Sequence, residues 1–341
     1  MTTVGLLTGG GDAPGLNAVL RAIVRRSLPR GMRMIGIRHG WRGLLNLETT
    51  ALDASAVSGI LHRGGTILGT SRTNPYKNPE DARRVEANFS ALRLDALVAI
   101  GGEDTLGVAA KLSAAGFPVV GVPKTIDNDL SGTDITFGFD TAVSIATEAI
   151  DRLHSTAESH DRVIVCEVMG RHAGWIALHA GMAGGADFVL FPERLVDVDA
   201  VCAAVKRREA RGLRFSIIVA AEGARLAEGE VTKAEETDAF GHAKLGGIGE
   251  RLAHEIEARI GCETRSVQLG HVQRGGTPTA FDRWLGSRYG LLAADMVDER
   301  KFGMMAAYRG GIFEAVPLAS AVAQLKTVPA ALIDQASALF A

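Results

Sequence analysis

Residues 4–15 read VGLLTGGGDAPG, a short apolar run followed at once by three glycines, an aspartate and a proline. The pattern predicts a buried strand over residues 4–7 and a helix that begins near residue 14. Glycine lets backbone N–H groups approach an anion, and a helix N-terminus favours negative charge. We expect Asp12 to cap the helix and Pro14 to stand in its first turn. Taken alone, the stretch fits a phosphate loop or a plain tight turn.

The same order of strand, polar loop and helix recurs along most of the chain. Apolar runs separated by amphipathic stretches indicate parallel sheets that are covered by helices on both faces. The predicted strands are residues 4–7, 32–37, 94–100, 118–122, 163–168, 188–191, 215–220 and 265–269. Helical patterns lie near 14–26, 104–115, 141–158, 173–182, 199–211, 248–260 and 280–299. We therefore predict two open, Rossmann-like α/β/α domains with the active-site cleft between the carboxyl ends of their strands.

Length and composition limit the classes of function. A chain of 341 residues predicts two domains at about 100–200 residues each. The 37 Lys and Arg against 39 Asp and Glu leave a net charge of −2, which gives no basic footprint for nucleic acid. The three cysteines are widely spaced, which does not suggest a disulfide framework. No long apolar run and no basic leader is visible, so we expect a cytoplasmic protein without membrane contact. The polar stretch 225–238 is predicted to be a surface loop.

Two polar clusters follow the predicted strands 94–100 and 118–122. Glu103 and Asp104 stand beside two glycines, where they could hold a divalent cation or simply complement the dipole of the next helix. In the second cluster, Lys124 and Thr125 precede Asp127 and Asp129. A carboxylate there could act as a general base while the lysine neutralises phosphate charge.

Two further clusters place basic groups beside glycine. They read EVMGRHAG (residues 167–174) and GHVQRGGTP (residues 270–278). Arginine suits bidentate contact with phosphate oxygens, and histidine adds a further donor. A single arginine or histidine of this kind is more often structural, so the argument depends on the clusters occurring together.

The five clusters together resemble the phosphofructokinase family over essentially the whole chain. The resemblance lies in GGGDAPGLN (9–17), TIDND (125–129), MGR (169–171) and LGHVQRGG (269–276). It implies phosphoryl transfer with Mg²⁺ to the 1-hydroxyl of fructose 6-phosphate. It also implies a donor domain of residues 1–138 plus about 275–325 and a fructose 6-phosphate domain of residues 139–274 plus the C-terminal segment.

The resemblance further implies roles for individual residues. Asp127 matches the catalytic base, Glu103 the metal position, and Gly11 and Arg72 the donor-phosphate contacts. The matched substrate-binding positions are Thr125, Asp129, Arg162, Met169, Gly170, Arg171, Glu222, Arg265, His271 and Arg274. In the family, the equivalents of Arg162 and Arg265 come from a neighbouring subunit, which implies a homodimer or homotetramer with shared sites.

Two departures from the family's ATP-dependent pattern concern the donor. Asp104 and Lys124 both stand where the ATP enzymes usually have glycine. A carboxylate at 104 would meet the α-phosphate of a nucleotide, and like charges at close range can cost several kcal/mol. Lys124 would help to stabilise a pyrophosphate leaving group. The pair resembles the pyrophosphate-dependent, actinobacterial-type branch, so we predict a reversible reaction of pyrophosphate and fructose 6-phosphate in glycolysis and gluconeogenesis.

Three alternatives remain at this point. The first is an ATP-dependent 6-phosphofructokinase. The second is a dinucleotide-dependent dehydrogenase, although GGGDAPG is not the GxGxxG that it would need. The third is a silent sugar-phosphate sensor, which would not need Asp127 and Glu103. Arg21 and Arg25 match positions used by nucleotide effectors in some bacterial relatives, and they equally fit a solvated helix face.

Overall fold

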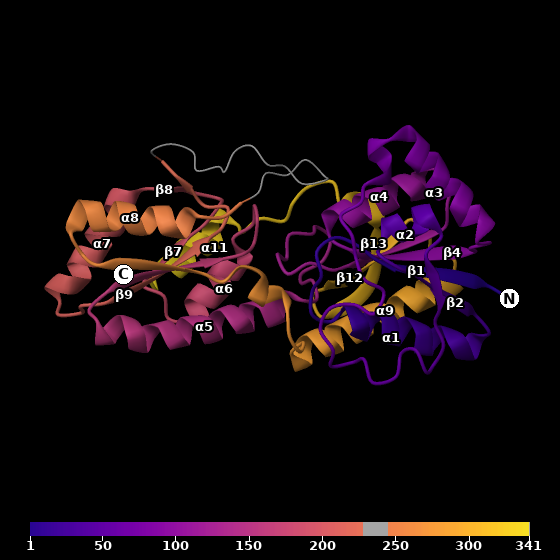
Figure 1. The fold of residues 1–341 in the computed structure, drawn as a ribbon, viewed down its shortest axis with the longest axis horizontal. Helices are drawn as coiled ribbons and strands as arrows, with labels where there is room; N and C mark the ends of the chain where they lie inside the picture. Colours follow the sequence, from indigo (N-terminus) through magenta and orange to yellow (C-terminus); the bar gives the residue numbers. More distant parts are fainter. Residues whose placement is uncertain (228–244, 341) are drawn as a thin grey trace.

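The computed structural model describes residues 1–227 and 245–340. This part of the chain forms two lobes, each built around its own sheet (Figure 1). The sheets are mostly parallel and covered by helices on both faces, so the predicted fold class is confirmed. No helix among these residues is long and apolar enough to cross a membrane.

The N-terminal lobe contains a seven-stranded sheet in the order β13-β12-β5-β4-β1-β2-β3. Its strands are β1 (Thr3–Thr8), β2 (Arg33–Ile37), β3 (Thr49–Ala51), β4 (Ala96–Gly101), β5 (Val119–Pro123), β12 (Met304–Arg309) and β13 (Ile312–Pro317). The pairs β12–β13 and β2–β3 are antiparallel and the other neighbours are parallel. The helices are α1 (Leu16–Ser27), α2 (Trp41–Asn46), α3 (Pro79–Ala91), α4 (Glu103–Ala114), α9 (Ala280–Asp298) and α10 (Leu318–Ala321).

Side chains alternate across this sheet, as the pleat of a strand requires. In β4, Val98 and Ile100 pack with α1 and α9, whereas Leu97 and Ala99 pack with α2, α3 and α4 on the other face. Both faces are therefore apolar, which explains why the central strands read as continuous hydrophobic runs.

The second lobe contains a four-stranded parallel sheet in the order β11-β6-β9-β7. Its strands are β6 (Val163–Val168), β7 (Phe188–Leu190), β9 (Ser216–Ala221) and β11 (Thr264–Gln268), with a small pair formed by β8 (Leu195–Val196) and β10 (Arg225–Leu226). Helices α5 (Phe139–Ser159), α6 (Trp175–Ala183) and α11 (Ala330–Ser337) cover one face, and α7 (Val198–Ala210) and α8 (Ile248–Ile260) cover the other.

Several local predictions need correction. Helix α1 begins at Leu16, so Asp12 does not cap it and Pro14 lies outside its first turn. The residue before the helix is Gly15, whose φ of 99° favours glycine. A Cβ added at this position would lie 2.9 Å from the Phe137 ring. Part of the predicted loop at 225–238 is the short strand β10, and residues 228–238 lie outside the described part.

Other elements were not predicted, including α2, α3, α11 and the β12–β13 hairpin. The signals for α3 were present, because Asn78 caps its start, Pro79 takes the first position and two acidic residues follow. The hairpin turns at Gly310 and Gly311, both with positive φ, which is a strong hairpin signal.

Candidate active site

The carboxyl ends of β1, β4 and β5 lie side by side, because these strands are parallel neighbours. The loops that follow them enclose a narrow cleft of about 50 Å³. Its lining is Gly10, Gly11, Arg72, Gly102, Glu103, Asp104, Thr105, Lys124, Thr125, Asp127, Asp129, Arg171 and Arg274. Residues from six separate stretches of the sequence therefore meet in one place. Arg171 and Arg274 belong to the loops that follow β6 and β11.

Lys124 is buried at the base of this cleft, 3% exposed, where its Nζ donates a hydrogen bond to the Gly11 carbonyl. Burial, together with the nearby Arg274 guanidinium, lowers the pKa of Lys124 to about 7 against the opposing charge of Asp127. An anion placed beside Nζ would favour the protonated form, because opposite charge stabilises the ammonium ion. The lysine is therefore suited to an anionic ligand.

Asp127 and Asp129 are both buried, and each has an Oδ1 atom with no hydrogen-bond partner among the described residues. Asn128 between them has a φ of 52°, a left-handed conformation that asparagine tolerates better than most residues. The backbone N–H of Asp127 donates to Thr125 Oγ1 over 3.0 Å. Burial, with the charge of Asp127, raises the pKa of Asp129 to about 7. Unpartnered buried oxygens of this kind are unusual in a purely structural turn.

Glu103 and Asp104 form the first turn of α4, so the prediction that they meet the positive end of a helix is confirmed. Both also line the cleft. Asp104 Oδ2 lies 4.0 Å from Arg171 Nη1, a contact between the first turn of α4 and the loop after β6.

On the sugar side predicted from the sequence, Glu222 Oε1 accepts a hydrogen bond from the Arg171 N–H over 3.1 Å. Burial, with the charge of Asp127, raises the pKa of Glu222 to about 7. Gly170 has a φ of 141°, and the N–H of Met169 donates to Gln273 Oε1 over 3.4 Å. The loops after β6, β9 and β11 thus hold one another in place.

Arg274 reaches across to the glycine loop after β1. Its Nη1 donates to the Asp12 carbonyl over 3.1 Å. A Cβ on Gly11 would stand 2.6 Å from the same nitrogen, so only glycine allows this approach without a shift.

Six predicted substrate-binding residues do not line the cleft: Met169, Gly170 and Glu222, described above, and Arg162, Arg265 and His271. Arg162 and Arg265 flank the pair β6–β11 and both contact Glu263, at 2.8 and 2.6 Å. These contacts help to lower the pKa of Glu263. His271 is exposed in the 3₁₀ helix η3 (Gly270–Arg274). The side chain of Arg265 is about half exposed and that of Arg162 is partly exposed, and neither lines the cleft that contains Asp127.

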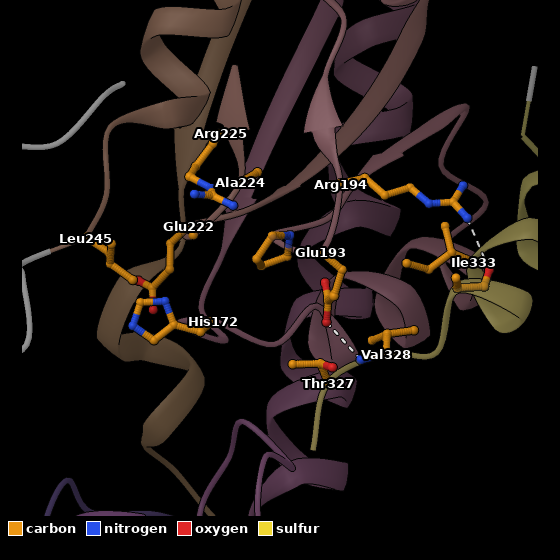
Figure 2. A pocket seen from close by; sticks show the side chains of 13 residues that line it. His172, Glu193, Arg194, Glu222, Ala224, Arg225, Leu245, Thr327, Val328 and Ile333 are labelled. Atoms are coloured by element: carbon orange, nitrogen blue, oxygen red, sulfur yellow. Dashed lines mark hydrogen bonds between the residues drawn. The ribbon is translucent and has the colours of Figure 1, made fainter. Parts of the chain in front are cut away.

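A larger cavity of about 660 Å³ opens beyond the carboxyl ends of β7 and β9 (Figure 2). Glu222, His172 and Arg225 stand on one side of it, and Arg194 on the other. Glu193 Oε1 accepts a hydrogen bond from the Val328 N–H over 2.8 Å, drawn as a dashed line in Figure 2. The cavity does not include Asp127 or Lys124, which both line the narrower cleft.

Sequence reasoning missed some residues of the site. Thr105 is buried against Gly9 and Gly101 and lines the cleft, and Gln273 is fully buried beneath Met169. Thr105 follows Glu103 and Asp104, and Gln273 lies in the cluster GHVQRGGTP (270–278), so their position in these clusters was the signal in the sequence. Glu167, also in such a cluster, accepts hydrogen bonds from backbone N–H groups at the start of α8 and is structural.

The family model described as Phosphofructokinase matches residues 3–297. The chain belongs to the phosphofructokinase family. It is therefore a phosphotransferase, and the alternative of a dinucleotide-dependent dehydrogenase is wrong. The resemblance stated from the motifs is confirmed.

Relatives within the phosphofructokinase family carry both kinds of donor in their names. The pyrophosphate–fructose 6-phosphate 1-phosphotransferase of Streptomyces coelicolor is 58% identical over 99% of each chain. The ATP-dependent 6-phosphofructokinase 3 of the same organism is 54% identical over 98% of each chain. The crystal structure of a pyrophosphate-dependent phosphofructokinase from Nitrosospira multiformis superposes with a TM-score of 0.85 over 96% of this chain and 86% of its own, at 21% identity. That likeness supports the fold alone.

Proposed function

We propose that this phosphotransferase moves a phosphoryl group reversibly between Mg²⁺-pyrophosphate and the 1-hydroxyl of fructose 6-phosphate. The observation that carries the proposal is that Lys124, Asp104, Asp127 and Asp129 line one narrow cleft. Lys124, Asp127 and Asp129 are buried there. Exchange of one phosphoanhydride bond for one phosphoester leaves the reaction near equilibrium, so we expect it to run in both directions, in glycolysis and in gluconeogenesis.

Asp127 is the proposed general base. Its unpartnered Oδ1 is available to accept the proton of the sugar hydroxyl as that oxygen attacks phosphorus. Thr125 and Asp129 flank the acceptor, and Glu222, Met169, Gly170 and Arg171 would contact the sugar. Phosphoryl transfer needs mainly positioning and charge stabilisation, which a cleft of fixed, buried charges can supply.

The phosphate groups would lie between Lys124, Arg72 and the backbone of Gly11. Mg²⁺ usually takes one or two carboxylates and completes its shell with phosphate oxygens and water. No group of three or more His, Cys, Asp or Glu side chains suited to a metal occurs in the described residues. Glu103 at the cleft rim fits an ion held chiefly by substrate phosphates, whose chemistry is to neutralise charge on the transferring group.

The choice of pyrophosphate over ATP depends on Asp104 and Lys124, because relatives of both kinds are more than half identical to this chain. Asp104 narrows the cleft where a nucleotide would extend beyond its terminal phosphates, and adds negative charge there. Lys124 supplies a cation beside the leaving group. Both effects favour the shorter donor.

The 6-phosphate would be held by Arg274 and His271 together with Arg162 and Arg265 of another copy. This arrangement is supported by the contacts of Arg162 and Arg265 with Glu263, since neither arginine lines the cleft of its own chain. We propose a homodimer or homotetramer whose sites are completed between subunits.

A donor comparison tests the proposal. Fructose 6-phosphate and Mg²⁺ are supplied with either pyrophosphate or ATP, and kcat/KM is measured for each. We expect the larger value with pyrophosphate, together with phosphate-dependent breakdown of fructose 1,6-bisphosphate. A larger value with ATP would instead establish the ATP-dependent alternative.

A further inference from the structure

Residues 324–328, here called the C-terminal strap, lie between the two lobes and contact loops of both. The strap leaves α10 in the N-terminal lobe and leads to α11 in the other (Figure 1). Leu325 pairs with Leu130 in an antiparallel bridge, and the N–H of Lys326 donates to the Asp129 carbonyl over 2.7 Å. Ser131 Oγ donates to the Gln324 carbonyl over 2.8 Å. The loop that carries Asp127 is therefore held along one side by this strap.

The side chain of Lys326 continues the same contact. Its Nζ donates to Asn128 Oδ1 and the Thr133 carbonyl, each at 3.0 Å, and to the Asp134 carbonyl at 2.8 Å. An ammonium group has three donors, so all of them are used within this one loop. Such a cation fixes loop geometry rather than capturing a ligand.

Asn128 links the contacts of Lys326 to the two carboxylates of the proposed site. Its left-handed backbone turns the chain between the two carboxylates, Asp127 and Asp129. Its Oδ1 accepts hydrogen bonds from both Lys326 Nζ and the Thr136 N–H, the latter over 3.0 Å. A sparsely populated backbone state persists only where its surroundings hold it. Loss of Lys326 would remove the only charged one of the three donors to Asn128 Oδ1 among the described residues.

The strap is also tied to the second lobe. Trp175 Nε1 donates to the Lys326 carbonyl over 2.8 Å, and Lys326 Nζ lies 5.6 Å from the centre of the Trp175 ring. Glu193 Oε1 accepts from the N–H groups of both Val328 and Gly174. Gly174 and Trp175 follow Arg171, so the strap joins the loop of the proposed base to the loop of the proposed sugar contacts.

We propose that Lys326 is a positioning residue, which fixes the Asp127–Asp129 loop against the loop that follows β6. This rests on the proposed function in one respect, that Asp127 is the base.

Burial lowers the pKa of Lys326 to about 8, while the charges of Asp129 and Asp134 oppose the change. His179 is a further titratable group near the ammonium, and the lysine charge helps to lower its pKa. Lys326 is thus mainly protonated at neutral pH.

The test compares Lys326→Met with Lys111→Met in the full-length enzyme. Lys111 also lies over an aromatic ring, that of Tyr76 at 5.4 Å, but on the exposed side of α4 away from the cleft. Displacement of a catalytic group by about 1 Å can cost about a hundredfold in rate. We expect Lys326→Met to lower kcat by about 10- to 100-fold with little change in the KM of either substrate, and Lys111→Met to leave both unchanged.

Hydrogen exchange of the amides of residues 125–136 gives a readout that does not depend on activity. We expect faster exchange there in Lys326→Met, and a smaller change in the same direction in Trp175→Phe, which keeps a ring but loses the N–H bond to the strap. Unchanged kcat with unchanged exchange would overturn the proposal, as would a rise in KM alone. If the wild type prefers ATP, the proposed donor fails while the same comparison, made with ATP, still decides the role of Lys326.

Discussion

The two sides of the proposed site differ in how completely one chain builds them. On the donor side, Lys124, Asp127 and Asp129 are each less than 10% exposed and surround a cleft only about 50 Å³ in volume. On the sugar-phosphate side, Arg162 and Arg265 contact Glu263 at the edge of the second sheet and do not face the cleft.

The difference lies in the environment of the charges. Two buried groups on the donor side, Lys124 and Asp129, have pKa values displaced to about 7, chiefly by loss of water. The arginines at the edge remain in contact with solvent, where ion pairs contribute little. A single chain therefore preorganises the phosphoryl-transfer groups, whereas in the proposed arrangement Arg162 and Arg265 would complete the site of another copy. The four predictions below test this contrast.

The largest effect is expected for Asp127→Ser. Loss of a positioned general base should lower kcat by about 10²- to 10⁴-fold, while calorimetry should still detect binding of fructose 6-phosphate. The control is Asp151→Ser, on the exposed face of α5, which should keep full activity. Unchanged turnover in Asp127→Ser would refute the base assignment, and a wild type that binds the sugar without turnover would favour the sensor.

Next in size is the double variant Asp104→Gly with Lys124→Gly. Removal of a stabilising group from a phosphate site should lower kcat/KM for pyrophosphate by about 10²- to 10³-fold, and the added room should admit ATP. The single variants separate the two roles, since Asp104→Gly alone should raise ATP use most. Intact pyrophosphate activity in the double variant would show that neither residue selects the donor.

Arg162→Ala and Arg265→Ala should each raise the KM for fructose 6-phosphate by about 10-fold, equivalent to about 1.4 kcal/mol of lost binding. Co-expression then tests shared sites, because a mixed oligomer of Asp127→Ser and Arg162→Ala subunits contains one site with both residues intact. Sites with the wild-type KM should appear in that mixture, although neither variant has them alone. If only the raised KM of Arg162→Ala is found, each chain completes its own site.

The smallest effect concerns the dependence of stability on pH. The folded protein holds the Glu222 proton more tightly than the unfolded chain, because its pKa is raised from 4.5 to about 7. Stability from this group is therefore present below about pH 4.5 and is lost as the pH rises through 7. In Glu222→Gln this loss should disappear, so the Tm of the variant relative to wild type should rise between about pH 5 and about pH 8. Glu158→Gln, on the exposed end of α5, should show no such trend.

Prediction of strands from the sequence succeeded where a strand is a continuous run of apolar residues. β6 occupies residues 163–168, the range expected from its apolar run, because a strand buried on both faces is apolar throughout. The β12–β13 hairpin was not predicted, although Gly310-Gly311 is a hairpin-turn signal in the sequence. Half of β13 is exposed, so its sequence lacks the continuous apolar run of a buried strand.

The site shows the same division. Lys124 and Asp127 were found because they follow a strand in one short cluster. Lys326 was not found, because it is a single lysine in a stretch (AVAQLKTVPA, residues 321–330) with no other charged residue, and its partner Asn128 is 198 residues away. No local pattern marks such a contact.

The sequence by itself determined the order of strands and polar clusters, and with them the fold class and the family, because each cluster and its strand are contiguous in the chain. The tertiary structure alone decided which clusters meet, that Lys124 and Asp129 are deprived of water, and that Arg162 and Arg265 contact Glu263 and do not line the cleft. The physical reason is that burial and electrostatic coupling depend on groups brought together from distant parts of the chain, and they exist only once the two lobes have packed.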